Sequence, residues 1–108
     1  MAQDIQASID SAVSALTSAL HPKQIYLFGS QAEGRARHDS DIDLLVVVED
    51  GFGEKLSNTT KAYRATRELP LAKDIIVDHE SVFKRRSQWD SSIERKVLET
   101  GKIVYARP

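Results

Sequence analysis

The spacing of apolar residues along the chain predicts alternating helices and strands. From residue 5 to residue 20, apolar side chains recur about every fourth position, which is the period of one face of an amphipathic helix. Short runs rich in β-branched and aromatic residues, bounded by glycine, proline or aspartate, predict strands instead. The predicted helices cover residues 3–20, 54–69, 81–86 and 91–100, and the predicted strands cover residues 24–28, 41–48, 73–78 and 102–105. This order predicts an α/β (α+β) fold in which helices flank a small mixed β-sheet.

Details of the pattern place the strands and the turns between them. Residues 44–48 are apolar at every position, as expected for a central strand covered on both faces. Residues 30–36 are expected to form one or two helical turns, with Ser30 available to cap the first. Gly101 is well placed to end the last helix.

Composition narrows the class of protein. The chain has 108 residues, which is room for a single domain over residues 1–108. Its 15 basic and 16 acidic residues leave a net charge of −1, which argues against a protein that coats nucleic acid. The absence of cysteine excludes disulfides, thiolate zinc sites and cysteine nucleophiles. No apolar run is long enough to span a membrane and no secretion signal is visible, so we predict a cytoplasmic protein.

Two acids at the start of a predicted strand are the first candidate for chemistry. Side chains alternate along a strand, so Asp41 and Asp43 project from the same face, about 6–7 Å apart along the chain. Two carboxylates on one face repel each other unless a positive charge lies between them. Hard oxygen ligands favour magnesium or manganese over zinc or copper. The pair therefore predicts a divalent metal site.

A glycine and a serine precede this pair. Gly29 permits a close approach of the backbone, and Ser30 would start a short helix whose free N–H groups could hold phosphates. Phosphate, metal and carboxylates side by side are what phosphoryl or nucleotidyl transfer requires. On its own the Gly-Ser pair is a weak signal, and no P-loop sequence follows it.

A third acid is expected from another strand. Asp74 opens an apolar run, where a charged residue must face solvent or a ligand. If its strand lies beside the second strand, Asp74 completes a site of three carboxylates. Two alternatives remain open from the residues alone. Asp74 could simply pair with Lys73, or Asp78 could be the third acid instead.

These residues together resemble a known family. Gly29-Ser30, then ten residues, then Asp41-Ile-Asp43, then Asp74 in Asp-Ile-Ile-Val is similar to the signature of the DNA polymerase β-like nucleotidyltransferases. The resemblance is closest to the minimal nucleotidyltransferases and runs over almost the whole chain, from Ile25 to Tyr105. It implies the polymerase β-like nucleotidyltransferase fold.

The resemblance implies a role for each matched position. Gly29 and Ser30 would hold the β- and γ-phosphates of ATP. Asp41 and Asp43 would bridge two magnesium ions, or manganese in their place. Asp74 would bind the ion nearest the attacking hydroxyl, so these three aspartates would be both catalytic and metal-binding.

Other positions are assigned less directly. Ser40 would orient the aspartates through its hydroxyl. Many relatives carry a basic residue where this chain has Glu33, and Arg35 and Arg37 are close enough in sequence to bind the nucleotide in its place.

The function implied is the transfer of AMP from ATP to a hydroxyl, with release of pyrophosphate. So small a chain has little surface for an acceptor, so the acceptor or a second subunit must supply specificity. The resemblance implies an antitoxin that adenylylates a tyrosine of a HEPN-domain ribonuclease toxin, as part of a homo- or hetero-oligomer. Alternatives are an antitoxin that only masks its toxin, or a subunit that modifies a small molecule. Nucleic acid is disfavoured as substrate by the net charge of −1.

Overall fold

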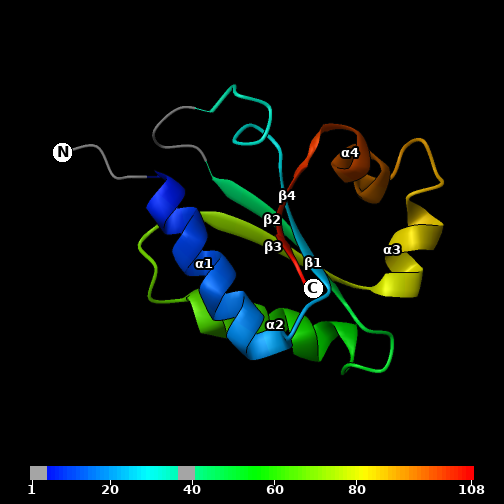
Figure 1. The fold of residues 1–108 in the computed structure, drawn as a ribbon, viewed down its shortest axis with the longest axis horizontal. Coiled ribbons are helices and arrows are strands. Elements are labelled where there is room, and N and C mark those ends of the chain that lie inside the picture. The colour runs from blue at the N-terminus through cyan, green and yellow to red at the C-terminus, as the bar shows by residue number, and fades with distance from the viewer. Residues whose placement is uncertain (1–4, 37–40) are drawn as a thin grey trace.

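Helices and strands alternate along the chain in a computed structural model, which describes residues 5–36 and 41–108 (Figure 1). Each predicted element is present, with bounds that differ by at most a few residues. The elements are α1 (Ile5–Leu20), β1 (Gln24–Phe28), β2 (Ile42–Val48), α2 (Lys55–Thr66), β3 (Lys73–His79), α3 (Glu80–Arg86), α4 (Ile93–Thr100) and β4 (Lys102–Ala106). None of the helices in these two ranges is long and apolar enough to cross a membrane.

The strands form a mixed sheet, as the sequence predicts. Their order is β3-β2-β1-β4, so β2 and β1 are central and β3 and β4 are the edges. β1 is antiparallel to both β2 and β4, whereas β2 and β3 are parallel. β3 follows β2 by way of helix α2, the kind of crossover that parallel neighbours need.

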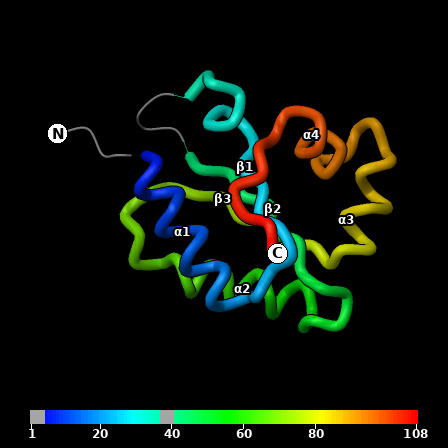
Figure 2. Tube along the Cα trace, in the orientation of Figure 1, coloured from blue at the N-terminus to red at the C-terminus, as the bar shows by residue number. Residues whose placement is uncertain are grey.

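Helices cover both faces of the sheet (Figures 1 and 2). Leu44 and Val46 of β2 pack on the side of α1 and α2, where Leu16 is completely buried. Leu45 of β2 packs on the opposite side with Phe83 of α3. β2 is therefore covered on both faces, which confirms its predicted central position and explains its uninterrupted apolar run.

The segment after β1 differs from its prediction. Residues 29–34 form turns and not a helix, so Ser30 has no helix to cap. Two backbone hydrogen bonds close this single turn, from Glu33 N–H to Gly29 C=O (3.1 Å) and from Arg35 N–H to Ser30 C=O (3.0 Å). Gly34 then adopts a φ of 74°, in the left-handed region, which is incompatible with continuing a right-handed helix.

Gly101 ends α4 as predicted, but not through a left-handed conformation. Its φ is −80°, and its N–H donates to Val97 C=O (2.8 Å). A Cβ at this position would lie 2.5 Å from that carbonyl oxygen and 3.0 Å from Leu27 C=O of β1. Close approach of α4 to the sheet, and not backbone freedom, requires glycine here.

Candidate active site

Two of the predicted acids lie side by side at the start of the parallel strand pair. The register of β2 and β3 places Asp43 directly beside Asp74. Asp41 precedes β2 and is exposed, Asp74 is exposed, and Asp43 is partly buried between neighbouring strands. Parallel strands begin at the same edge of a sheet, so acids near both strand starts meet there. We call Asp41, Asp43 and Asp74 the carboxylate cluster.

The turn after β1 lies against this cluster. β1 is antiparallel to β2 with Phe28 beside Asp43, so the chain leaves β1 next to the Asp43 carboxylate. Gly29 follows with a φ of 74°. A Cβ built on Gly29 would collide with Asp43 Oδ2. Glycine is therefore favoured by the backbone conformation at this position, and any larger residue would also have to displace the Asp43 carboxylate.

The three carboxylates act on one another electrostatically. Burial raises the pKa of Asp43, and the negative charges of Asp74 and then Asp41 raise it further, as does a hydrogen bond with Asp74. A raised pKa of this origin means that the ionised cluster repels itself. A cation or a proton is needed to relieve that repulsion.

The donor set of the cluster suits a hard divalent cation. Its ligands are carboxylate oxygens, which magnesium and manganese prefer. The charges that raise the pKa of Asp43 are those that a divalent cation would neutralise. In the described ranges, no group of three or more acidic or histidine side chains is already drawn together as a metal site. The oxygen donors of these residues therefore fit the ion by their chemistry.

The remaining predicted nucleotide-binding residues have different surroundings. Ser30 lies in the turn beside the cluster and is partly buried. The Arg35 side chain is 62% exposed and forms an ion pair with Glu33 (3.4 Å). Glu33 therefore pairs with Arg35, the arginine that is expected to bind the nucleotide in its place. Ser40 and Arg37 lie outside the described residues.

The two candidates for the third acid have different surroundings. Asp78 lies four residues beyond Asp74, about 13 Å along the strand, and its side chain is completely buried. Lys73 Nζ donates to Leu71 C=O (3.5 Å) and forms no ion pair with Asp74 in the described part of the chain. Asp74 therefore stands beside Asp43 and faces solvent, whereas Asp78 belongs to another cluster.

That second cluster was not predicted from the sequence. Lys55 Nζ contacts Asp78 Oδ1 (2.9 Å), and Arg86 Nε contacts Glu94 Oε1 (2.9 Å). The four residues come from α2, β3, α3 and α4, and they are far apart in the sequence. We call them the buried charge cluster. The periodicity of helices and strands does not predict this cluster, because each of its residues is locally one polar position among many.

The two acids of the buried charge cluster shift each other's pKa values in opposite directions. Burial raises the pKa of Asp78 to about 6, Glu94 raises it and Lys55 opposes the rise. Burial would also raise the pKa of Glu94, but hydrogen bonds from Asp78, the backbone and Arg86 lower it. Asp78 Oδ2 is buried without a donor from the described residues. A proton on Asp78 makes this oxygen a donor to Glu94, which satisfies both groups.

Comparison with known proteins identifies relatives of this chain. The sequence model of the family described as "Polymerase beta, Nucleotidyltransferase" matches residues 11–108. A protein of Methanocaldococcus jannaschii, named as a protein adenylyltransferase, is 35% identical over 83 residues, which are 77% of this chain and 78% of that protein.

Solved structures share the fold at lower identity. A Sulfolobus solfataricus protein described as a nucleotidyltransferase superposes with a TM-score of 0.64 at 22% identity, over 95% of this chain and 86% of that one. A toxin–antitoxin structure with AMP-PNP superposes with a TM-score of 0.59 at 21% identity, over 91% of this chain and 73% of that one. A mutant of the toxin–antitoxin pair MntA–HpeT superposes with a TM-score of 0.57 at 19% identity, over 91% of this chain and 72% of that one. At these identities the likeness establishes the fold.

Gly29 and Gly34 provide a matched test of the contact with Asp43. Both have a φ of 74°, but a Cβ at Gly34 would meet nothing within 4 Å. Gly34→Ala should cost about 1–2 kcal/mol of unfolding free energy for the left-handed backbone alone. Gly29→Ala should cost about 1–3 kcal/mol more, because the new methyl group must displace the Asp43 carboxylate. Urea unfolding of both variants measures the difference.

Removing the carboxylate should remove the extra cost. In an Asp43→Ala background, Gly29→Ala and Gly34→Ala should destabilise the protein by similar amounts, because the colliding atoms are gone. Equal losses of stability already in the wild-type background would contradict the proposed contact.

The buried charge cluster predicts a pH dependence of stability. The pKa of Asp78 is raised in the folded state, so its contribution is fully present below the unfolded pKa of about 4 and is lost as the pH rises through about 6. The unfolding free energy should fall by about 1 kcal/mol between pH 5 and 7 on this account. Asp78→Asn should abolish that slope. Urea titrations at several pH values give the unfolding free energy of both proteins, and the contributions of other titrating groups cancel in the difference between them. An unchanged slope in the variant would contradict the role of Asp78.

Proposed function

Because this chain belongs to the polymerase β family of nucleotidyltransferases, we propose that it transfers AMP from ATP to a hydroxyl group of a partner protein. The membership confirms the fold and the class of enzyme that the sequence predicts. The observation that carries the proposal is the meeting of Gly29, Asp43 and Asp74 at one edge of the sheet. No side-chain nucleophile is needed, because positioning and charge neutralisation can supply most of the catalysis.

The residues of the site divide the work between them. Asp41, Asp43 and Asp74 would hold magnesium ions. The turn at Gly29 and Ser30 would receive the triphosphate. Bound magnesium neutralises phosphate charge and lowers the pKa of an attacking hydroxyl.

The reaction is a single displacement at phosphorus. The acceptor oxygen forms a bond to the α-phosphorus of ATP, and the bond from that phosphorus to the bridging oxygen breaks. Pyrophosphate leaves with the electrons of that bond, and the hydroxyl proton passes to solvent. The chain would hold the two reactants in line. It would form no covalent intermediate of its own with AMP.

The order of the strands supports a separate side of the cluster for each substrate. Gly29 ends β1, Asp43 is on β2 and Asp74 is on the edge strand β3. A triphosphate bound at Gly29 therefore lies on the β1 side of the cluster. The acceptor hydroxyl is left with the β3 side, next to Asp74.

A protein acceptor accords with the known relatives. One relative is named as a protein adenylyltransferase, and two structural neighbours are toxin–antitoxin complexes, one of them with AMP-PNP. We propose that the acceptor is a tyrosine of a HEPN-type ribonuclease toxin, held in a complex with this chain in the cytoplasm. An added AMP brings bulk and negative charge to a surface that must bind RNA phosphates, so a single modification could inactivate the toxin.

Replacing the two paired aspartates tests this function. Asp41→Asn with Asp43→Asn should abolish magnesium-dependent ATP binding in calorimetry, because the metal-binding oxygens lose their charge. The double variant should be at least as stable as the wild type without metal, because the repulsion on Asp43 is relieved. A HEPN-type toxin co-expressed with the wild type should gain about 329 Da, the mass of one AMP, and none with the double variant.

Asp90→Asn is the matched control, because it removes an exposed acid from the turn between α3 and α4, outside the cluster. It should leave ATP binding and labelling of the toxin unchanged. If the toxin is unlabelled yet neutralised by both wild type and double variant, the chain acts by masking and not by adenylylation.

Asp74 should matter more for turnover than for nucleotide affinity, because it lies on the acceptor side of the cluster. Asp74→Asn should leave the affinity for ATP within a few-fold and reduce the rate of AMP transfer by orders of magnitude. Asp78→Asn should transfer AMP at nearly the wild-type rate, because Asp78 is buried at the other end of β3. Single-turnover assays of both variants give the comparison; the reverse pattern would move the role to Asp78.

A further inference from the structure

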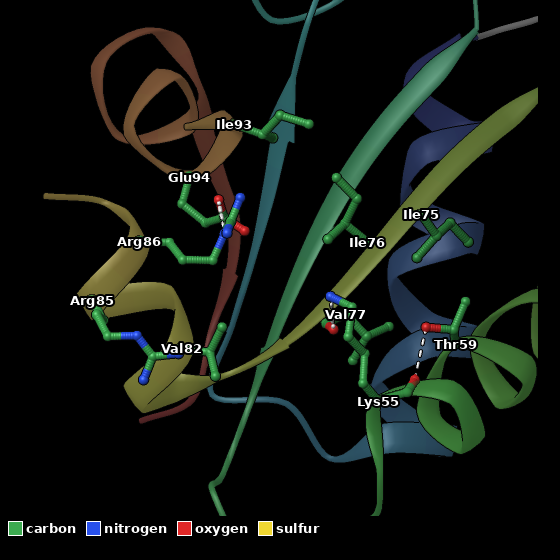
Figure 3. Close-up of a pocket in the computed structure, with 10 residues that line it drawn as sticks. All are labelled: Lys55, Thr59, Ile75, Ile76, Val77, Val82, Arg85, Arg86, Ile93 and Glu94. Carbon is green, nitrogen blue, oxygen red and sulfur yellow. Dashed lines mark hydrogen bonds and ion pairs between the residues drawn. The ribbon is translucent and has the colours of Figure 1, made fainter. Parts of the chain in front are cut away.

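A trough lies along the outer edge of β3 (Figure 3), where its lining begins with Ile75, the residue after Asp74 of the carboxylate cluster. Its volume is about 610 Å³, in the range of sites that hold sizeable ligands. Lys55 and Thr59 of α2 line one side, and α3 and the start of α4 line the other. Ile76 of β3 lies between them, two residues beyond Asp74 on the same face of the strand, about 6–7 Å away.

This position is on the acceptor side of the cluster. Gly29 lies on the β1 side of Asp43, whereas the trough begins beyond Asp74 on the β3 side. A chain that lies in the trough can therefore present a side chain to Asp74 without displacing a triphosphate at Gly29. Glu94, a buried acid, is among the residues that line the trough.

The floor of the trough is an unpaired strand edge. The backbone groups of Ile75 and Val77 point away from β2; Tyr63 Oη accepts Ile75 N–H (2.9 Å), and Lys55 Nζ donates to Val77 C=O (3.3 Å). Ile75 C=O and Val77 N–H have no hydrogen-bond partner among the described residues, although Val77 is only 1% exposed. These two groups lie on either side of Ile76. In a parallel pair of strands, one residue of an added strand would make both of its backbone hydrogen bonds to two groups spaced in this way. Such an edge favours an extended occupant.

The walls of the trough indicate the chemistry of that occupant. Ile76, Val82 and Ile93 give it apolar walls, and Ile93 is 48% exposed. Three cations line the trough against one acid, Glu94. Lys55 and Arg86 each hold a buried carboxylate, but Arg85 forms no ion pair with any described residue. The trough is therefore complementary to apolar side chains interspersed with acidic ones.

We propose that this trough docks an extended, apolar and acidic segment of the acceptor protein and so delivers its hydroxyl to Asp74. The inference rests on the proposed function and adds to it a site of acceptor recognition. The edge of the sheet would thereby supply a surface that selects the protein substrate.

Isoleucine methyl NMR tests the proposal directly. The probe is a synthetic peptide in which valine and glutamate alternate around a central tyrosine. Its addition to the full chain should shift the methyl signals of Ile76 and Ile93. The methyl signal of Ile103, 56% exposed on β4 at the opposite edge of the sheet, should not move. A peptide with lysine in place of glutamate should bind at least several-fold more weakly.

Charge reversal provides a matched pair of variants. Arg85→Glu should weaken binding of the glutamate peptide roughly tenfold. Lys96→Glu makes the same change in charge on an exposed position of α4 outside the trough and should leave binding unchanged. Unmoved Ile76 and Ile93 signals, equal binding of the lysine peptide, or equal effects of the two variants would each overturn the proposal.

The same samples separate this proposal from the proposed function. Magnesium-dependent ATP binding does not require the trough. A wild-type chain that fails to bind ATP contradicts the proposed function. A chain that binds ATP but leaves the Ile76 and Ile93 methyl signals unmoved contradicts only the docking trough.

Discussion

The parallel pairing of β2 with β3 is the constraint on which the rest of this structure depends. Its register brings Asp43 beside Asp74, an arrangement that is electrostatically unfavourable in the absence of a cation. The strands nonetheless stay paired because the rest of β2, from Leu44 to Val48, is buried on both faces of the sheet. Apolar burial along a strand of seven residues thus holds in place two charges that repel each other at its start.

The two ends of β3 show two ways of accommodating neighbouring acids. At the far end, Asp78 and Glu94 are buried, and the chain supplies their partners itself, from Lys55 and Arg86. At the near end, no ion pair to the carboxylate cluster is formed by the residues that the structure describes. The first arrangement is internally compensated and contributes to packing. The second has no partner of this kind among the described residues, so an external cation would have to compensate its charge, as the proposed function requires.

The sheet also separates the partners of the proposed reaction. β1 brings the Gly29 turn to one side of Asp43, and β3 brings Asp74 and the trough to the other. Nucleotide and acceptor would therefore approach the cluster from opposite directions across the strands. The unpaired edge of β3 follows directly on from Asp74, the acid assigned to the acceptor.

The sequence by itself determined the helices and strands, the central place of β2 and the proximity of Asp41 to Asp43. These follow from local periodicity and from short-range strand geometry. Only the tertiary structure decided that Asp74 and not Asp78 joins Asp43, because strand register depends on packing between segments thirty residues apart. It also decided that the segment after β1 is a turn, and it assembled the buried charge cluster from four separate elements. Long-range contacts of this kind leave no period in the sequence, whereas the burial of an apolar strand does.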